Sequence, residues 1–245
     1  MNIAIDIGNS SAKVALLENG SVTKCMRIER LDVEFLADIF RQADKPIEQA
    51  VLSTVAGVEA EVENFLKQHT GYYLRVDHTT PMPIRNGYAT PHTLGIDRLV
   101  AAVGATTFFE GCNILVVDLG TAITVDMVSS EGMFLGGNIS LGASGRFRAL
   151  NDYTAGLPLV KLSESANDQL GTDTQSAIRN GVVGGIVYEL EGYIARAEKK
   201  YDDLKIIFTG GDAKYFAKRL KNTIFATADL VFLGLNKILE YNAKS

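Results

Sequence analysis

The stretch Ala4-Ile-Asp-Ile-Gly-Asn-Ser-Ser-Ala-Lys-Val-Ala-Leu16 decides the fold of this chain. It runs apolar up to a turn at Gly8 and then runs apolar again, which predicts the two strands of a hairpin. A similar stretch, Ile114-Leu-Val-Val-Asp-Leu-Gly-Thr-Ala-Ile-Thr-Val125, occurs in the second half. One Asp-x-Gly turn is common in proteins. Two of them, each opening one half of the chain, indicate a structural repeat.

Composition narrows the class of protein. The chain has 245 residues, enough for one large domain or two of average size. A hydrophobic fraction of 47% with 22% charged residues is typical of a soluble globular protein. The net charge of -5 argues against nucleic acid or a membrane surface as the main partner. A local cluster of cations or a metal could still bind an anionic small molecule.

Neither the cysteines nor the N-terminus indicates a secreted protein. Cys25 and Cys112 are far apart in sequence, so reduced thiols are expected. Asp6, Lys13 and Glu18 interrupt any signal-peptide pattern, and no apolar run is long enough to span a bilayer. We therefore expect a cytoplasmic protein. The histidines have no metal-ligand spacing, and we expect surface or loop positions for His69, His78 and His92.

The spacing of apolar residues predicts similar elements in each half. The first half is expected to contain strands 2–7, 12–17, 22–28, 49–54 and 72–76, helices 32–43 and 58–68, a proline-rich loop 78–93 and a helix ending at residue 109. The second half is expected to contain strands 113–119, 122–128, 132–140, 204–208 and 223–226, and helices 143–151, 173–200, 213–220 and 229–241. These predict an α/β protein with an N-terminal domain 1–110 and a C-terminal domain 111–245. The alternative is one mixed α/β domain with two coincidental hairpins.

The two turns suggest phosphate binding. A glycine turn between strands exposes backbone N–H groups that can bind phosphate oxygens. The polar residues that could add contacts are neutral donors and one cation: Asn9, Ser10, Ser11, Thr121 and Lys13. Asp6 and Asp118, just before the turns, could hold the cations that neutralise phosphates. Together the loops predict a nucleotide site without a Walker, Rossmann or protein-kinase signature. For either loop alone, an ordinary hairpin turn is the alternative.

A third group of residues, Gly95-Ile-Asp-Arg98, follows the proline-rich loop. A carboxylate at Asp97 could accept the proton of an alcohol in phosphoryl transfer, and Arg98 could bind an anionic substrate. The alternative is a helix-capping carboxylate beside a solvated cation. Asp212, after Gly210 and Gly211, is interpreted as the cap of the next helix, although the glycine pair could also let a nucleotide base approach.

The chain resembles the type III pantothenate kinases, of the superfamily of acetate and sugar kinases, heat-shock chaperones and actin. The resemblance covers nearly the full length and rests on an ordered set of motifs: Asp6-Ile-Gly-Asn-Ser-Ser-Ala-Lys13, Gly95-Ile-Asp-Arg98, Asp118-Leu-Gly-Thr-Ala122, Gly136-Gly-Asn-Ile139, Gly171-Thr172 and Thr209-Gly-Gly211. Two positions depart from the pattern: Ser10 replaces a usual threonine and Leu141 an expected proline. Neither change removes a group that the chemistry needs.

The resemblance implies two RNase H-like domains of the actin-like ATPase type, each with a mixed sheet opened by a three-strand meander and flanked by helices. It further implies a homodimer that uses ATP to phosphorylate pantothenate on its primary alcohol, the first step of coenzyme A synthesis. Another small-molecule kinase of the superfamily, such as a sugar or acetate kinase, and a non-catalytic regulator are the alternatives. The glycine-bearing helix 173–200 is the expected dimer contact.

The resemblance also implies roles for individual residues. Asp97 resembles the proton acceptor, and Asp118 the ligand of a monovalent cation, K⁺ or NH₄⁺. Mg²⁺ would accompany ATP, with Asp6 as a possible ligand. The implied pantothenate contacts are Tyr88, Gly95, Ile96, Asp97, Arg98 and Thr172. The implied ATP contacts are Asp6, Ile7, Gly8, Asn9, Ser10, Ser11, Ala12, Lys13 and Thr121.

Overall fold

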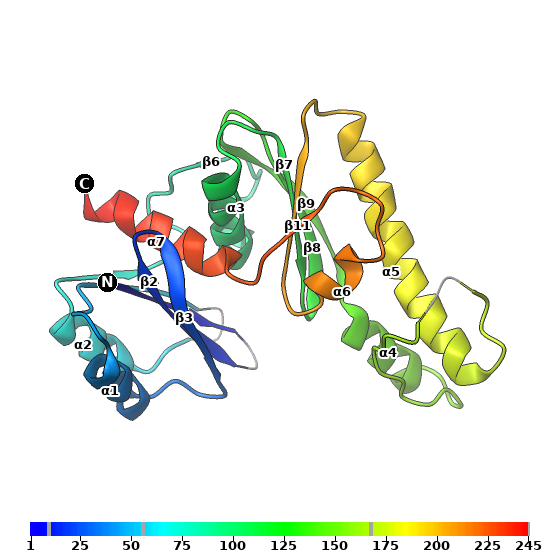
Figure 1. Ribbon diagram of the computed structural model, residues 1–245, viewed down its shortest axis with the longest axis horizontal. Helices are drawn as coiled ribbons and strands as arrows, with labels where there is room; N and C mark the ends of the chain where they lie inside the picture. The colour runs from blue at the N-terminus through cyan, green and yellow to red at the C-terminus, as the bar shows by residue number, and fades with distance from the viewer. Residues whose placement is uncertain (9–10, 55–56, 167–168, 245) are drawn as a thin grey trace. The chain divides into compact units, whose positions relative to one another are not determined.

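The computed structural model describes residues 1–8, 11–54, 57–166 and 169–244 (Figure 1). Its contacts divide the chain into two compact units. Unit 1 comprises Met1–Glu110, Gly132–Phe134 and Asp229–Ser245, and unit 2 comprises Gly111–Glu131 and Leu135–Ala228. The predicted domains 1–110 and 111–245 stay a prediction, with the last helix of the chain lying in unit 1.

Unit 1 is built on a five-stranded mixed sheet. Its strands are β1 (Asn2–Ile7), β2 (Ala12–Glu18), β3 (Ser21–Ile28), β4 (Gln49–Thr54) and β5 (Tyr72–Arg75), in the spatial order β3-β2-β1-β4-β5. β1 pairs antiparallel with β2 and parallel with β4, and β2 pairs antiparallel with β3. The predicted three-strand meander is confirmed. The carboxyl ends of β1 and β4 therefore lie at one edge, where open α/β sheets bind ligands.

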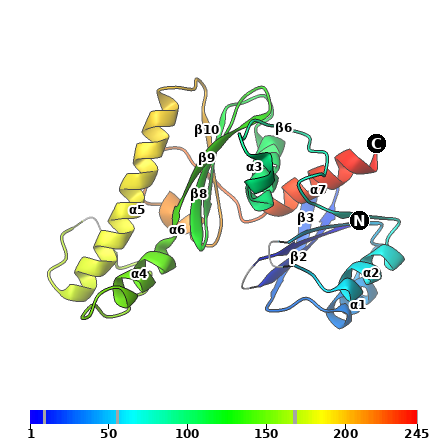
Figure 2. The same cartoon turned by 180° about the vertical axis from the view of Figure 1, so that it is seen from behind.

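Helices cover both faces of this sheet (Figures 1 and 2). Ile3 and Ile5 of β1 face a core with α1 (Val33–Gln42) and α2 (Ala60–His69). On the other face, Asn2 Nδ2 donates to Asn236 Oδ1 of α7 (Leu230–Ala243) at 2.8 Å. Because side chains alternate along a strand, Asp6 shares the α7 face with Asn2.

The N-terminal end of α7 crosses α3 (Ile96–Phe108) at a pair of glycines. A Cβ at Gly104 would collide with the carbonyl oxygen of Leu230, and one at Gly234 with that of Val100. Backbones packed this closely leave no room for a side chain. The crossing fixes α3, and with it the segment Gly95–Arg98, inside unit 1.

The loop 78–93 is more regular than predicted. It contains the short strand β6 (Arg85–Asn86) and a 3-10 helix over Pro91–Thr93. β6 pairs in parallel with Met133 and Phe134 at the start of β9 (Met133–Leu141). A two-residue strand leaves no periodic signal in the sequence, which is why it was missed.

Unit 2 repeats the topology of unit 1. Its strands β7 (Ile114–Leu119), β8 (Ala122–Val128), β9, β10 (Lys205–Thr209) and β11 (Phe225–Ala226) belong to a sheet of order β11-β10-β7-β8-β9-β6. Leaving β6 aside, this is the order of the first sheet, and β7, β10 and β11 are again parallel. The predicted repeat is confirmed in strand order.

The helices of unit 2 are α4 (Ala143–Asp152), α5 (Thr174–Glu198) and α6 (Ala213–Ala217), and all three contribute to its core. α5 begins at Thr174, after a capping box between Asp173 and Ser176, one residue later than the predicted start at 173. α6 ends before the predicted residue 220.

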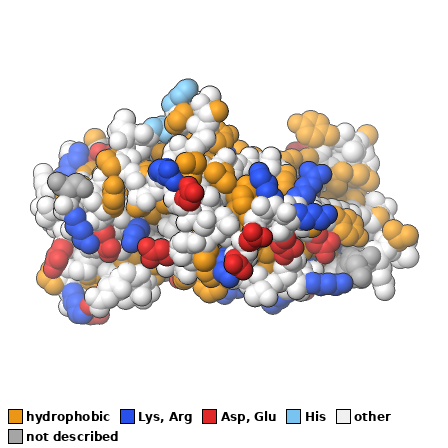
Figure 3. All heavy atoms as spheres, turned by 90° about the horizontal axis from the view of Figure 1, so that it is seen from above, with side chains coloured by type: hydrophobic (Ala, Val, Ile, Leu, Met, Phe, Trp, Pro, Cys, Tyr) orange, Lys and Arg blue, Asp and Glu red, His pale blue; other side chains and the backbone are white. Residues whose placement is uncertain are grey.

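Within the described part of the chain, none of the helices combines the length and apolarity needed to cross a membrane. Positive and negative side chains intermingle on the face shown in Figure 3.

Candidate active site

A row of polar side chains crosses the sheet of unit 1 near the first turn. Asp6 on β1 lies opposite Lys13 on β2 and Ser53 on β4, and Lys13 lies opposite Arg27 on β3. Residues directly opposite each other point to the same face of a sheet. The row therefore begins with the two cations Arg27 and Lys13 and continues through the Asp6 carboxylate to the buried hydroxyl of Ser53. It lies on the face of the sheet that packs against α7.

Asp6 is poorly solvated in this row. Burial is the main cause that raises its pKa, the charge of Asp97 raises it further, and Lys13 opposes both. The first loop and the Gly95–Arg98 segment both belong to unit 1, and the charge of Asp97 acts on the Asp6 carboxylate. A carboxylate such as Asp6, opposite an ammonium that can bind phosphate oxygens, suits a divalent cation that also carries phosphate ligands.

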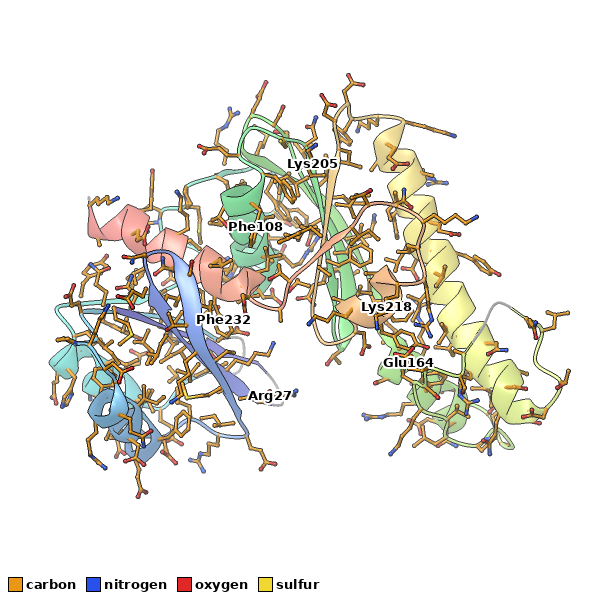
Figure 4. The ribbon with its side chains drawn as sticks, in the orientation of Figure 1. Arg27, Phe108, Glu164, Lys205, Lys218 and Phe232 are labelled. Atoms are coloured by element: carbon orange, nitrogen blue, oxygen red, sulfur yellow. The ribbon has the colours of Figure 1, made fainter. Side chains whose placement is uncertain are left out.

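The first turn closes through its backbone and is braced by an arginine. Gly8 N donates to Ser11 O at 3.1 Å, and Ile7 pairs with Ala12. Arg27, labelled in Figure 4, donates from Nε to Ser11 Oγ at 3.1 Å. Sequence reasoning missed Arg27, whose only signal was its register opposite Lys13. Two implied ATP contacts, Asn9 and Ser10, lie outside the described residues.

A pocket of about 540 Å³ adjoins this turn. The turn contributes Ile7, Gly8, Ser11 and Ala12 to its wall, and the segments 29–31 and 57–59 contribute the rest. The carboxyl end of β1 thus opens onto free volume, as expected of a phosphate-binding turn in an α/β sheet.

The segment Gly95–Arg98 forms the start of α3. A Cβ at Gly95 would collide with the Asp97 carboxylate, so a side chain there would force that carboxylate to move. Asp97 Oδ1 accepts the backbone N–H of Arg98 at 2.9 Å and is exposed. Arg98 itself is only 6% exposed, so the alternative of a solvated cation is wrong. Ile96 lines a neighbouring pocket together with residues of the proline-rich loop.

Tyr88 approaches this segment from the loop. Its ring centroid lies 5.7 Å from Arg98 Cζ, within the range of a cation–π contact. The structure thus brings the sequence-predicted residues Tyr88, Asp97 and Arg98 together in unit 1. Thr172 lies in unit 2, exposed, and directly precedes the Asp173 cap of α5.

The second turn is crowded by backbone. Gly120 N donates to Ala122 O at 3.1 Å, and Gly142 N donates to Thr121 O at 3.0 Å. A Cβ at Gly142 would collide with the carbonyl oxygen of Gly120. The turn around Thr121 is therefore held by close main-chain packing.

Asp118 lies under the Thr209-Gly-Gly211 turn. Gly210 has φ +91°, and a Cβ there would collide with both the Asp118 carboxylate and the Leu119 carbonyl. Carboxylate and carbonyl oxygens gathered in this way suit a monovalent cation. Asp212 N donates to Leu119 O at 3.0 Å, and its side chain makes no capping bond to α6. The interpretation of the Asp212 side chain as a helix cap is wrong; burial raises its pKa instead.

A buried acid, Asp126, was missed by sequence reasoning. It is 2% exposed on β8, and a Cβ at Gly137 would collide with its carboxylate. An aspartate within the apolar run of β8 was the available signal. Gly137 of the Gly136-Gly-Asn-Ile139 motif is thereby explained as space for this carboxylate, and Gly136 by its φ of +114°.

The described residues contain no group of three or more His, Cys, Asp or Glu side chains that could hold a metal ion. Substrate phosphates commonly provide ligands for Mg²⁺.

Comparison with known proteins decides the family. A family model described as type III pantothenate kinase matches residues 2–196. The chain belongs to this family. A type III pantothenate kinase from Bacteroides fragilis (strain ATCC 25285) is 43% identical over 242 residues, covering 99% of this chain and 98% of the relative. One from Phocaeicola vulgatus is 38% identical over 244 residues and covers both chains completely.

Solved structures confirm the fold. A "conserved putative Baf family transcriptional activator" from Campylobacter jejuni has a TM-score of 0.61 at 23% identity, covering 99% of this chain and 100% of the other. A "putative 2-dehydro-3-deoxygalactonokinase" from Sinorhizobium meliloti has a TM-score of 0.60 at 13% identity, covering 99% of each. A "ROK family protein" from Streptococcus pneumoniae has the same fold, with a TM-score of 0.54 at 14% identity, covering 99% of this chain and 100% of the other. Leu141, which replaces the proline expected from the family pattern, is the last residue of β9 in this chain, and Gly142 directly precedes α4.

Proposed function

We propose that this protein transfers the γ-phosphoryl group of ATP to the primary alcohol of pantothenate, giving ADP and 4'-phosphopantothenate in the first step of coenzyme A synthesis. Membership in the family supports the reaction. The arrangement that supports it at the level of residues is Asp6 opposite Lys13 at the carboxyl end of β1, with the exposed carboxylate of Asp97 in the same unit. It joins a candidate base to a candidate phosphate-binding turn.

Asp97 is the proposed proton acceptor. Its carboxylate takes the proton of the substrate hydroxyl as the hydroxyl oxygen bonds to the γ-phosphorus and the bond to ADP breaks. Its exposure leaves it accessible to a substrate, and its bond from the Arg98 backbone orients one oxygen. The other oxygen is the proposed acceptor.

Arg98 is the proposed partner of the pantothenate carboxylate, because a guanidinium binds a carboxylate through two parallel hydrogen bonds. Tyr88, Gly95, Ile96 and Thr172 are proposed further substrate contacts. Gly95 and Ile96 are supported by their position beside Asp97, and Tyr88 by its contact with Arg98.

The ATP phosphates are proposed to bind the N–H groups and side chains of Asp6–Lys13 and the side chain of Thr121. When bound, Mg²⁺ neutralises the phosphate oxygens and draws charge from the bond to ADP. Asp6 is its proposed protein ligand, supported by its place at the carboxyl end of β1 opposite Lys13. The ammonium of Lys13, opposite Asp6 on the neighbouring strand, would bind a phosphate oxygen.

Asp118 is the proposed ligand of a monovalent cation, supported by the oxygens packed around it. Replacing K⁺ by Na⁺ at constant Mg²⁺ is expected to lower turnover. An Asp118→Asn variant should lose most of its response to this exchange. Equal wild-type turnover in the two salts would contradict the assignment.

We also propose that the protein is a cytoplasmic homodimer that joins through α5. Among the described residues, a Cβ at Gly181, Gly185 or Gly192 would meet no atom within 4 Å, and Tyr188 is 65% exposed. An open strip of glycine beside an exposed aromatic suits the close approach of a second backbone. Light scattering should give twice the chain mass. Tyr188→Glu should lower that mass, whereas Tyr153→Glu, an exposed control, should not.

An acceptor panel tests the proposed reaction. ADP formation is measured with pantothenate, acetate and a set of sugars, and without acceptor. Stimulation by pantothenate alone is expected. Stimulation by a sugar or by acetate would identify a different kinase, and binding of pantothenate and ATP without ADP formation would identify a regulator.

A further inference from the structure

A closed network of three polar side chains joins β9, α4 and α5 within unit 2. Ser140 Oγ donates to Glu189 Oε1 at 2.7 Å and accepts a hydrogen bond from Arg146 Nη2 at 3.2 Å. Arg146 also forms an ion pair with Glu189, and their side chains are only 23% and 21% exposed. Each of the three residues therefore contacts both of the others.

The same arginine also holds the end of β9. Arg146 Nε donates to the carbonyl oxygen of Leu141, the last residue of the strand, at 2.7 Å. A guanidinium presents its N–H groups in a rigid planar fork, so fixing one side of the fork fixes the other side as well. Glu189 and Ser140 thus determine where the Nε–H group points, and this group determines where the Leu141 carbonyl lies.

The position of Arg146 does not favour the helix in which it stands. Its backbone N–H donates to the carbonyl oxygen of Gly142, the N-cap of α4, at 3.0 Å, so it lies near the start of the helix. The helix dipole favours negative charge at this end. Glu189 of α5 supplies the negative charge that compensates the cation. The network is therefore better explained by what it holds in place outside α4.

The residue after Leu141 packs against the second turn. Gly142 N donates to Thr121 O at 3.0 Å, and a Cβ at Gly142 would collide with the carbonyl oxygens of Gly120 and Thr121. The first turn of α4 lies beside the same group, because a Cβ at Gly145 would be 3.7 Å from Thr121 O. Packing this close transmits displacements. A shift of the Leu141 carbonyl would move Gly142 and, through it, the turn at Thr121.

We propose that Arg146 is a positioning residue for nucleotide binding. Oriented by Glu189 and Ser140, it holds Leu141 and the following glycine against the second turn and keeps Thr121 where its hydroxyl meets a phosphate group of ATP. The phosphate contact of Thr121 rests on the proposed function, whereas the hold of Arg146 on the turn does not. Arg146 itself touches neither a substrate nor the reacting atoms.

The kinetic test is Arg146→Lys, which keeps the charge beside Glu189 and removes the planar fork. Loss of about one hydrogen bond should raise the KM for ATP about 3- to 10-fold. The kcat and the KM for pantothenate should stay within about twofold, because the lost binding energy is common to the ground and transition states. Arg148→Lys, at an exposed position of the same helix, should leave all three constants near wild type.

A second variant approaches the network from α5. Glu189→Gln keeps the shape of the side chain and removes the ion pair, so the KM for ATP should rise in the same selective way. Glu191→Gln, at an exposed position of α5, is its control. An unchanged KM for ATP in both folded variants, Arg146→Lys and Glu189→Gln, would overturn the proposal. Equal changes in all three constants would also overturn it, because they would show that the network only stabilises unit 2.

The second readout is amide hydrogen exchange, measured by NMR in protein without ATP. Gly142 is buried and its N–H is hydrogen-bonded to the second turn, so its exchange reports local opening there. Arg146→Lys should speed this exchange about 3- to 10-fold and leave that of Ile207 in β10 unchanged. Unchanged exchange at Gly142 would overturn the proposal. A wild-type protein that forms no ADP, with exchange at Gly142 faster in Arg146→Lys, would overturn the proposed function and still support the hold of Arg146 on the turn.

Discussion

The two Asp-x-Gly turns occupy the same place in two sheets of the same strand order, yet their surroundings differ. Around the first turn, side chains carry charge: Lys13 lies opposite Asp6, Arg27 lies opposite Lys13, and the charge of Asp97 acts on Asp6. Around the second turn, the backbone itself packs closely, and glycines at 142 and 210 leave no room for a Cβ.

This difference teaches that a repeated fold can divide one chemical task. In the proposed function, the charged groups that neutralise phosphate lie at the turn of unit 1, and the proton acceptor Asp97 lies in the same unit. The turn in unit 2 has main-chain donors and carbonyls in a fixed arrangement, which suits a ligand held by shape. Substitutions that remove a charge should therefore lower activity most in unit 1, and substitutions that enlarge a side chain should lower it most in unit 2.

The largest effect is expected at Asp97. Asp97→Asn keeps the shape of the side chain and removes the proton acceptor, so kcat should fall by about 10²- to 10⁴-fold. The melting temperature should change little because the side chain is exposed. Asp44→Asn, another exposed aspartate of unit 1, is the control. A kcat near wild type in Asp97→Asn would remove the proposed base.

The second-largest effect is expected when a glycine at the second turn, in unit 2, is replaced by a larger residue. Gly142→Ala puts a methyl group against the carbonyl of Gly120, and overpacking of this kind costs about 1–3 kcal/mol. The turn at Thr121 should shift, raising the KM for ATP and lowering the melting temperature. Gly156→Ala, with no atom near its Cβ, should behave as wild type. Normal ATP affinity in Gly142→Ala would show that the close packing does not serve nucleotide binding.

Removing the charge of Lys13 tests ATP binding at the first turn, as Gly142→Ala tests it at the second. Lys13→Met should raise the KM for ATP by about 10- to 100-fold, the value of one charge-assisted hydrogen bond to phosphate. Lys24→Met on β3 is the control. Equal, small effects of the two substitutions would mean that Lys13 has a structural partner and no phosphate contact.

The smallest effect is expected on the melting temperature when Asp6 is replaced by asparagine. Because burial raises the pKa of Asp6, ionisation disfavours the folded state at neutral pH. Asp6→Asn should therefore raise the melting temperature at pH 7 in the absence of ligands while lowering activity. The gain should vanish as the pH falls below 3.8, the ordinary pKa of the group, where aspartate is protonated in both states. Thermal unfolding across pH measures it, and a lower melting temperature for Asp6→Asn at pH 7 would contradict the interpretation.

Much of the fold could be predicted because its signals are local. Apolar periodicity gave the strands and long helices to within a few residues, and the Asp-x-Gly turns gave the repeat. The strand β6 could not be predicted, because its pairing with Met133 and Phe134 is a long-range contact of two residues. The end of α6 at Ala217 was missed for a related reason: tertiary packing decides such short helices.

The candidate site was only partly visible for similar reasons. Asp6, Lys13, Asp97 and Asp118 stand in motifs, so the sequence identifies them. Arg27 stands in no motif and joins the site through strand pairing. The aspartate at 212 shows the opposite error, since a helix-start position predicted a side-chain cap that the folded backbone does not use.

The most direct test of the account is the product formed by the wild-type chain from ATP and pantothenate, followed by phosphorus NMR. We predict equal amounts of ADP and a new phosphomonoester with the mass of 4'-phosphopantothenate, both formed at least about 10²-fold more slowly by Asp97→Asn. Release of inorganic phosphate in place of the ester, or an equal yield of ester from Asp97→Asn, would contradict it.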